Sequence, residues 1–210
     1  MATAIVLKRE IIKSRLINNI LGVSIFIVLT SLGAFVRIPL GFTPVPLTLQ
    51  TFFVLLSGAI LGPNLGLFSQ AGYLLLGAAG LPIFSGAGTG LLYLFGPTAG
   101  YIWGFILASF MAGHLVNRTS KDRLTPSTLL RINPEFIEGL NFWSIFLYMC
   151  LADLIILLCG SLWLYLGFKF SLRQALLLGF FPFIVGDIIK VIVAAHLYKN
   201  IQTRTKEIFS

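Results

Sequence analysis

Charged residues are scarce in this sequence. Its 210 residues include 15 Lys and Arg and only 7 Asp and Glu, so that 10% of the chain is charged. Hydrophobic residues make up 57%, above the roughly 45 to 50% that is usual for soluble domains. The composition therefore excludes an ordinary soluble domain and predicts an integral membrane protein.

Motifs of catalysis and of metal binding are also missing. The only cysteines, Cys150 and Cys159, lie nine residues apart in one apolar run, which excludes a disulfide within that helix and matches no metal-ligand spacing. The sequence has no GxxxxGK, HExxH or GxSxG pattern, and its basic residues form no nucleic-acid-binding motif. We therefore expect no metal, no cofactor, no nucleic-acid partner and no ATP hydrolysis by this chain itself.

Six apolar runs approach the length of about 20 residues that a membrane-spanning helix needs. They cover residues 18–36, 47–61, 65–80, 96–116, 142–166 and 182–197. The two short runs, which meet at Gly62-Pro63-Asn64, form either two spans or a re-entrant pair. Residues 171–179 predict a short amphipathic helix before the last span, with Ser171 as its N-cap. The predicted fold class is all-α, a polytopic membrane protein with a single membrane domain over residues 1–210.

Lys and Arg residues predict the orientation of this bundle. Eleven of them lie in the N-terminal segment 1–17, the loop 117–141 and the tail 198–210, whereas only three lie in the alternate segments and Lys190 lies within a span. Positive residues accumulate on the cytoplasmic side of a membrane. We therefore expect both termini and the loop 117–141 to be cytoplasmic, with residues 18–197 forming the six-helix bundle.

Two of the few charges lie inside the last apolar run, FPFIVGDIIKVIVAA. Asp187 and Lys190 are three residues apart, which places them on one helix face, where they can neutralise each other. A charge that faces lipid costs roughly 2.5 to 3.5 kcal/mol, so the pair is expected to face the bundle interior. It is either a structural ion pair or part of a ligand site, and we favour the ligand site because charges within spans mark substrate paths. Gly186 would let a ligand approach the backbone there.

Asp153 is the third charge within a span. Together with Asp187 it suggests an alternative class, the intramembrane aspartyl hydrolases. The sequence before Asp187 lacks the first glycine of the GxGD pattern of such enzymes, and Lys190 opposes a proton shared between two carboxylates. We therefore expect no enzymatic activity, and a structural and a functional role for Asp153 remain equally open.

Two loops on the predicted outer side carry unusual composition. The stretch RIPLGFTPVPLTLQ is stiffened by its prolines and predicts an extended lid that includes Pro44, Pro46 and Gln50. The stretch LPIFSGAGTGLLYLFGPTAGY combines glycines with aromatic residues, which suits close contact with a flat ligand. The aromatic candidates for ligand contact are Phe84, Tyr93 and Tyr101.

Four stretches resemble successive signatures of the BioY family, the biotin-capturing S component of bacterial energy-coupling-factor transporters. They are GAFVRIPLGFTPVPLTLQTFFVLLSGAILGP, GYLLLGAAGLPIFSGAGTG, FGPTAGYIWGF and FPFIVGDIIKVIVAA, which together extend from residue 33 to residue 195. The segments PVPLTLQ and PFxxGDxxK are the most specific parts of the resemblance. Asp153 matches no position of the family's motifs.

The resemblance implies a multi-pass protein of the bacterial cell membrane, surrounded by lipid, with an outward-facing biotin cavity under loop lids. It also implies partners: one transmembrane coupling protein and two cytoplasmic ATPases. In S components, a small-xxx-small step on the first helix lets the coupling protein approach, and the step here is Thr30 to Ala34. Asp187 would accept from the N–H groups of biotin, and Lys190 would pair with its carbonyl or carboxylate. The orientation of biotin stays open, and a different vitamin is the nearest alternative.

Overall fold

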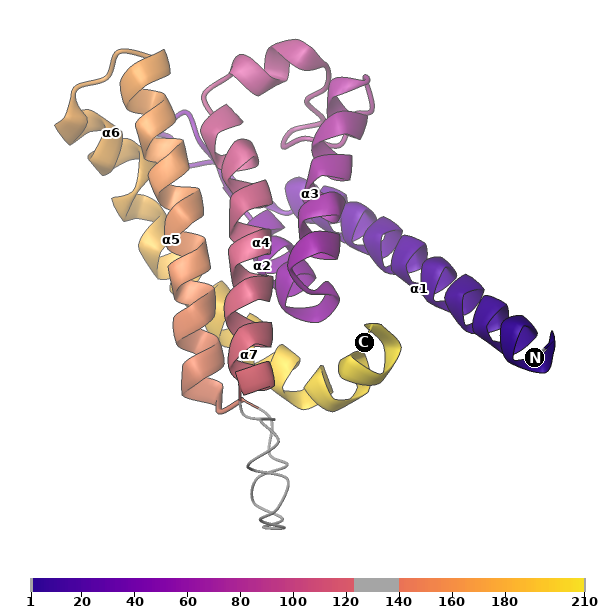
Figure 1. Ribbon diagram of the computed structural model, residues 1–210. Coiled ribbons are helices and arrows are strands. Elements are labelled where there is room, and N and C mark those ends of the chain that lie inside the picture. Colours follow the sequence, from indigo (N-terminus) through magenta and orange to yellow (C-terminus); the bar gives the residue numbers. More distant parts are fainter. Residues whose placement is uncertain (1, 123–139, 210) are drawn as a thin grey trace.

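The structure is a computed structural model that describes residues 2–122 and 140–209 (Figure 1). The predicted loop 117–141 therefore lies mostly outside the described residues. The helices and strands are α1 (Ala2–Phe35), β1 (Arg37–Ile38), β2 (Leu47–Thr48), α2 (Gln50–Leu61), α3 (Pro63–Ala78), the 3₁₀ helix η1 (Leu91–Phe95), α4 (Ala99–Asp122), α5 (Phe142–Gly167), α6 (Leu172–Gly179) and α7 (Phe181–Phe209).

Four segments of the described chain are long and apolar enough to cross a membrane. They are Leu16–Phe35, Ala99–Asn117, Phe142–Gly167 and Leu172–Ile201. The helix α2 is apolar but has only 12 residues, and α3 has 16. At about 1.5 Å per residue, α2 is roughly 18 Å long, which is shorter than the hydrocarbon core of a bilayer. The mostly helical membrane fold is thus confirmed at this level.

Several of the predicted helix boundaries differ from the structure, most clearly those of the first two helices. The first helix begins at Ala2 rather than at residue 18, because the basic segment before the apolar run continues the same helix. The second begins at Gln50 rather than at residue 47, because Leu47 and Thr48 form β2 and pair with β1. The predicted N-cap of the amphipathic helix is confirmed, since Ser171 and Gln174 form a capping box at the start of α6.

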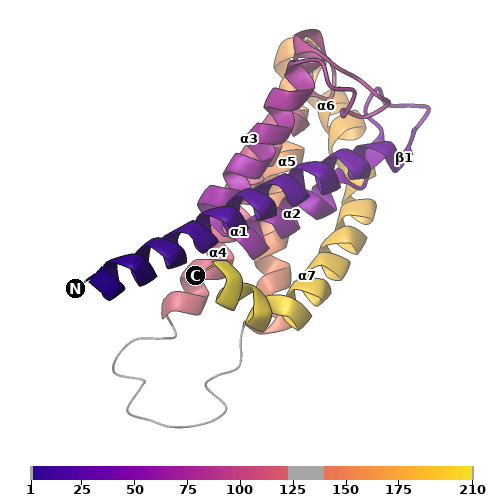
Figure 2. The ribbon, with the colours of Figure 1, turned by 90° about the vertical axis from the view of Figure 1, so that its right-hand side faces the viewer.

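The helices pack into a bundle that α1 crosses obliquely. The helices α4 and α5 run side by side, and the N-terminal part of α1 extends beyond the bundle (Figures 1 and 2). The helices α2 and α3 meet at Gly62, whose φ of 87° favours glycine. Close packing of α2 on α4 depends on Gly58, where an added Cβ would overlap the carbonyl oxygen of Ser109.

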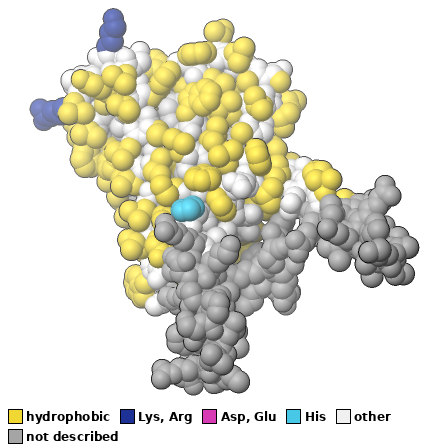
Figure 3. All heavy atoms as spheres, viewed as in Figure 1, with side chains coloured by type: hydrophobic (Ala, Val, Ile, Leu, Met, Phe, Trp, Pro, Cys, Tyr) yellow, Lys and Arg dark blue, Asp and Glu magenta, His cyan; other side chains and the backbone are white. Residues whose placement is uncertain are grey.

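The outer surface of the bundle is apolar. Figure 3 shows one face of the molecule covered by hydrophobic side chains, with two basic side chains projecting at one end. Many large side chains on α1, α5 and α7 are more than a third exposed in the chain alone. Such a surface suits a lipid environment, because lipid tails are as apolar as the side chains that face them.

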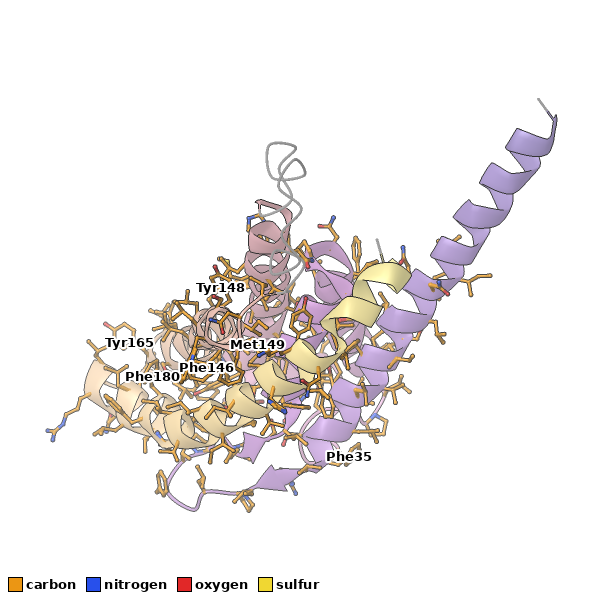
Figure 4. The ribbon with its side chains drawn as sticks, turned by 90° about the horizontal axis from the view of Figure 1, so that it is seen from below. Phe35, Phe146, Tyr148, Met149, Tyr165 and Phe180 are labelled. Carbon is orange, nitrogen blue, oxygen red and sulfur yellow. The ribbon has the colours of Figure 1, made fainter. Side chains whose placement is uncertain are left out.

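The loops of the predicted outer side converge on one another. The proline-rich stretch 37–50, here called the strap, contains the strands β1 and β2, which form an antiparallel pair beside the end of α1 (Figure 4). The strap reaches α6, where Thr43 Oγ1 donates to the Leu178 carbonyl over 2.7 Å. Arg37 lies against the second loop, since a Cβ at Gly86 would overlap its guanidinium group. These contacts bring the proline-rich strap, the glycine-rich loop and α6 together over one end of the bundle.

Candidate substrate-binding cavity

Asp187 and Lys190 form a buried ion pair on α7, as their spacing predicts. Lys190 Nζ lies 2.5 Å from Asp187 Oδ1, and the two side chains are only 11% and 4% exposed. Lys190 also donates to the backbone carbonyl of Thr48 and to Thr51 Oγ1, both over 2.8 Å. Thr51 Oγ1 in turn donates to Asp187 Oδ1 over 3.3 Å. The three donors of the ammonium group are thus all engaged.

This ion pair lies in the wall of a partly open cavity, where about 490 Å³ is free of protein atoms and part of that space is continuous with solvent. The strap, the start of α2, the glycine-rich loop, α4, α5 and α7 all contribute to the walls. The lining residues are Val45, Pro46, Leu47, Thr48, Gln50, Thr51, Ser85, Tyr93, Thr98, Tyr101, Ile102, Phe105, Ile156, Leu157, Phe183, Asp187 and Lys190. Segments far apart in the sequence therefore meet around a buried charge pair.

Two predicted aromatic contacts line the cavity, and their hydroxyl groups are already bonded. Tyr101 donates to the Gly179 carbonyl over 2.5 Å, and Tyr93 donates to the Ser85 carbonyl over 2.9 Å. Their rings therefore serve as apolar walls, while the hydroxyl groups hold α6 and the glycine-rich loop in place. Ser85 Oγ is buried and has no hydrogen-bond partner among the described residues. It is the polar atom of the cavity wall that most needs a partner.

Phe84 does not line the cavity, contrary to the prediction. Its side chain is fully buried, stacks on Tyr93 at 4.8 Å between ring centroids, and meets Tyr73 edge to face at 5.5 Å. Its ring covers Gly77 of α3, where any Cβ would overlap it. Phe84 therefore anchors the glycine-rich loop to the bundle, and its neighbour Tyr93 faces the cavity instead.

The predicted lid residues divide in a similar way. Pro46 and Gln50 line the cavity, whereas Pro44 does not. Gln50 Nε2 donates to the Tyr73 hydroxyl over 2.6 Å, so this amide is held within the bundle. Gly186 does not line the cavity either, because Leu47 of the strap packs against it, 3.0 Å from where a Cβ would lie. The lack of a side chain at Gly186 thus leaves room for Leu47 of the strap rather than for a ligand.

The structure also contradicts the predicted partner contact of Thr30 and Ala34 on the first helix. Both side chains are 0% exposed and face the interior of the chain. Thr30 Oγ1 contacts the amide of Gln70 on α3, and that amide also donates to the hydroxyl groups of Ser57 and Ser69. This polar cluster joins α1, α2 and α3, which explains a threonine on the inner face of α1.

Asp153 does not line the cavity, although it lines a neighbouring hollow together with Asp187. Its side chain is 5% exposed, and Oδ1 has no hydrogen-bond partner among the described residues. The carboxylate of Asp187 is engaged by Lys190 and Thr51, so the two aspartates do not form the proton-sharing dyad of an aspartyl hydrolase.

Reasoning from the sequence missed Thr48, Thr51 and Ser85. Thr48 contributes a backbone carbonyl, which no side-chain pattern reveals. Thr51 follows directly after the PVPLTLQ segment, at the start of an apolar helix. A polar side chain at such a position could have been recognised from the sequence as a candidate for the site. Ser85 lies in the glycine-rich loop, where a serine has no distinctive pattern.

A partly open, largely apolar cavity with a buried ion pair in its wall, set in a bundle with a lipid-suited surface, defines a ligand-binding membrane protein. The chain belongs to the BioY family, whose model matches residues 6–207. It is 39% identical over 185 residues to the "Probable biotin transporter BioY" of Pyrococcus horikoshii, and this match covers 87% of this chain and 95% of that protein. It is 35% identical over 178 residues to the "Biotin transporter BioY" of Thermotoga maritima, with 85% and 92% covered.

The fold matches a crystal structure at 2.1 Å of the S-component for biotin from an ECF-type ABC transporter. The TM-score is 0.76, and the match covers 89% of this chain and 92% of that chain. Since only 23% of the residues are identical, this likeness concerns the fold alone.

Proposed function

We propose that this protein captures biotin outside the cell as the S component of an ATP-driven vitamin transporter. The observation that carries the proposal is the Asp187–Lys190 pair in the wall of a largely apolar cavity. A charge pair used only for packing would not need a cavity beside it, and buried pairs rarely add net stability. Intramembrane charges beside a cavity are typical of substrate sites.

Biotin matches the chemistry of this cavity. It offers two ureido N–H donors and a carbonyl acceptor, a flat apolar bicycle, and a carboxylate at its other end. Asp187 can accept from N–H groups, and Lys190 can donate to the carbonyl or pair with the carboxylate. Tyr93, Tyr101 and Phe183 provide flat apolar surface for the bicycle. Ser85 Oγ supplies a hydroxyl group without a partner, which a polar group of the ligand would satisfy.

The strap and the glycine-rich loop act as lids over this site. Both contribute lining residues. The strap is held by a hydrogen bond from its Thr43 to the Leu178 carbonyl of α6 and by another from Lys190 to its Thr48 carbonyl. A ligand that competes for Lys190 weakens one of the bonds that hold the strap closed. Entry and exit of biotin therefore proceed by opening of the strap on the outer side.

In the membrane, the chain spans the bilayer six times with both termini in the cytoplasm, and α2 and α3 form the second and third crossings. Its partners are one transmembrane coupling protein and two ATPases. The ATPases supply the energy, because this chain has no nucleotide-binding motif with which to hydrolyse ATP. The positive-inside distribution of Lys and Arg supports this orientation. The chain itself is not an enzyme and resides in the bacterial cell membrane.

Calorimetric titration of biotin into the purified, lipid-reconstituted protein tests the proposal. We expect saturable binding to the wild type and to Lys199→Met, and no measurable binding to Lys190→Met. Lys199 is the matched control because it is an exposed lysine on the same helix. Thiamine and riboflavin serve as competitors. Saturable binding of thiamine or riboflavin, without binding of biotin, would show that the ligand of this protein is another vitamin.

A further inference from the structure

A second hollow lies beside the biotin cavity, between α5 and α7. It is a groove lined in part by Cys150, Asp153 and Leu154 on α5 and by Ile184, Asp187 and Ile188 on α7. Phe180, labelled in Figure 4 at the turn between α6 and α7, also lines it. Asp187 lines both the groove and the biotin cavity, so this one carboxylate connects the two.

Asp153 is the polar group of this groove. It is 5% exposed, and its Oδ1 atom is buried without a hydrogen-bond partner among the described residues. A buried ionised carboxylate without compensation is one of the most costly groups that a protein can hold. The groove therefore needs something to complement this atom.

The charges around the groove do not balance. Asp153 interacts electrostatically with Asp187 and with Lys190, so an ionised Asp153 would place two carboxylates near one ammonium group. Among the described residues, Cys150 interacts with Asp153, and Tyr101 on α4 interacts with Asp187. Neither supplies a positive charge, since thiols and phenols are neutral or anionic. With Asp153 ionised, this cluster of described residues therefore lacks one positive charge.

We propose that the α5–α7 groove binds a single positive charge at Asp153, carried by a proton or by an alkali cation. The described residues contain no group of three or more His, Cys, Asp or Glu that could hold a metal ion, so the site does not suit a divalent cation. A proton needs only the one carboxylate oxygen, and an alkali cation would add water molecules and Asp187. Either one comes from the aqueous phase and returns to it.

The shared Asp187 couples this site to the biotin cavity, an inference that rests on the proposed function. Biotin brings a carboxylate into a site that already has an excess of one negative charge. Binding of biotin therefore strengthens binding of the positive charge at Asp153, and by reciprocity the charge strengthens binding of biotin. About one proton or cation should be taken up with each biotin.

The ligand-free protein tests the site itself. The midpoint of thermal unfolding should rise by about 2 to 4 °C on lowering the pH, which identifies a proton, or on replacing choline with sodium at constant ionic strength, which identifies an alkali cation. Asp153→Asn should lose this dependence, whereas Ser161→Ala, another buried polar residue of α5, should keep it. An unchanged dependence in Asp153→Asn would overturn the proposal, whatever biotin does.

Calorimetry then tests the coupling. Titration of biotin in two buffers of different ionisation enthalpy counts the protons taken up, and titration in sodium and choline salts detects an alkali cation. We expect uptake of about one proton or cation per biotin in the wild type and of none in Asp153→Asn. The biotin affinity of Asp153→Asn should lie within about threefold of that of the wild type. Biotin binding with no uptake in the wild type would refute the coupling and leave the proposed function intact. Absence of biotin binding would refute the proposed function, and the unfolding experiment would still decide the cation site.

Discussion

Lys190 on α7 donates a hydrogen bond of 2.8 Å to the backbone carbonyl of Thr48 in the strap. This bond joins the buried charge of the cavity directly to a lid segment, more than a hundred residues away in the sequence. Thr48 also belongs to β2, which pairs with β1 at the end of the first helix. A ligand that engages Lys190 would therefore also affect the bond that holds the strap, which makes the ion pair the natural target for mutation.

Replacing the pair by apolar residues separates packing from ligand binding. Lys190→Met alone leaves Asp187 buried without its main partner and should destabilise the protein by about 3 to 5 kcal/mol. Adding Asp187→Leu should restore a monodisperse, folded protein, yet biotin affinity should fall at least about tenfold because the polar groups of biotin would be desolvated without partners. Size-exclusion chromatography and calorimetry measure the two effects. Wild-type affinity in the folded double variant would show that the pair does not contact the ligand.

Thr51 supports the ion pair from α2. Thr51→Val keeps the shape of the side chain and removes the oxygen that bonds to both Lys190 and Asp187. Since hydrogen bonds to charged groups contribute about 1.5 to 3 kcal/mol, we expect a tenfold to hundredfold loss of biotin affinity by calorimetry. The control is Thr48→Val, which keeps the carbonyl that Lys190 uses and should have a smaller effect. Equal effects of the two changes would contradict this assignment.

Ser85 tests whether the cavity is built for a polar ligand. Its Oγ has no partner in the empty protein, so Ser85→Ala should leave the melting temperature unchanged or slightly raised. Biotin affinity should nevertheless fall about threefold to tenfold, because one hydrogen bond is lost in the complex. The buried Ser109, which bonds to the Ile106 carbonyl outside the cavity, provides the control Ser109→Ala. Lower stability with unchanged affinity in Ser85→Ala would indicate a structural role.

Gly77 tests the anchoring of the glycine-rich loop. A methyl group there overlaps the Phe84 ring, and such overpacking typically costs about 1 to 3 kcal/mol. Gly77→Ala should therefore lower the melting temperature, and it should weaken biotin binding because Ser85 and Tyr93 move with the loop. Gly41→Ala, where no atom lies within 4 Å of the added methyl group, should change neither property. Unchanged binding in Gly77→Ala would show that the loop position does not shape the cavity.

The sequence was sufficient to predict the Asp187–Lys190 pair, the membrane environment and the N-cap at Ser171. Each of these depends on short-range rules: helical spacing, the cost of a charge facing lipid, and local hydrogen bonding at a helix start. It also predicted that the strap and the glycine-rich loop belong to the site, since proline and glycine restrict the backbone locally. At this level the resemblance to the BioY family and the chemistry of the residues agreed.

Which side chain of a segment faces the cavity was decided only by the tertiary structure. Phe84 and Tyr93 are both aromatic residues of one glycine-rich loop, yet Phe84 fills the space above Gly77 while Tyr93 reaches the ligand cavity. Thr30 has the spacing of a partner contact but bonds to Gln70 inside the bundle. The sequence by itself determined which segments enclose the site and which charges they carry, because these follow from local chemistry. Only the packing of distant helices determined which faces meet, because each face takes the neighbour that fills its space and satisfies its polar atoms.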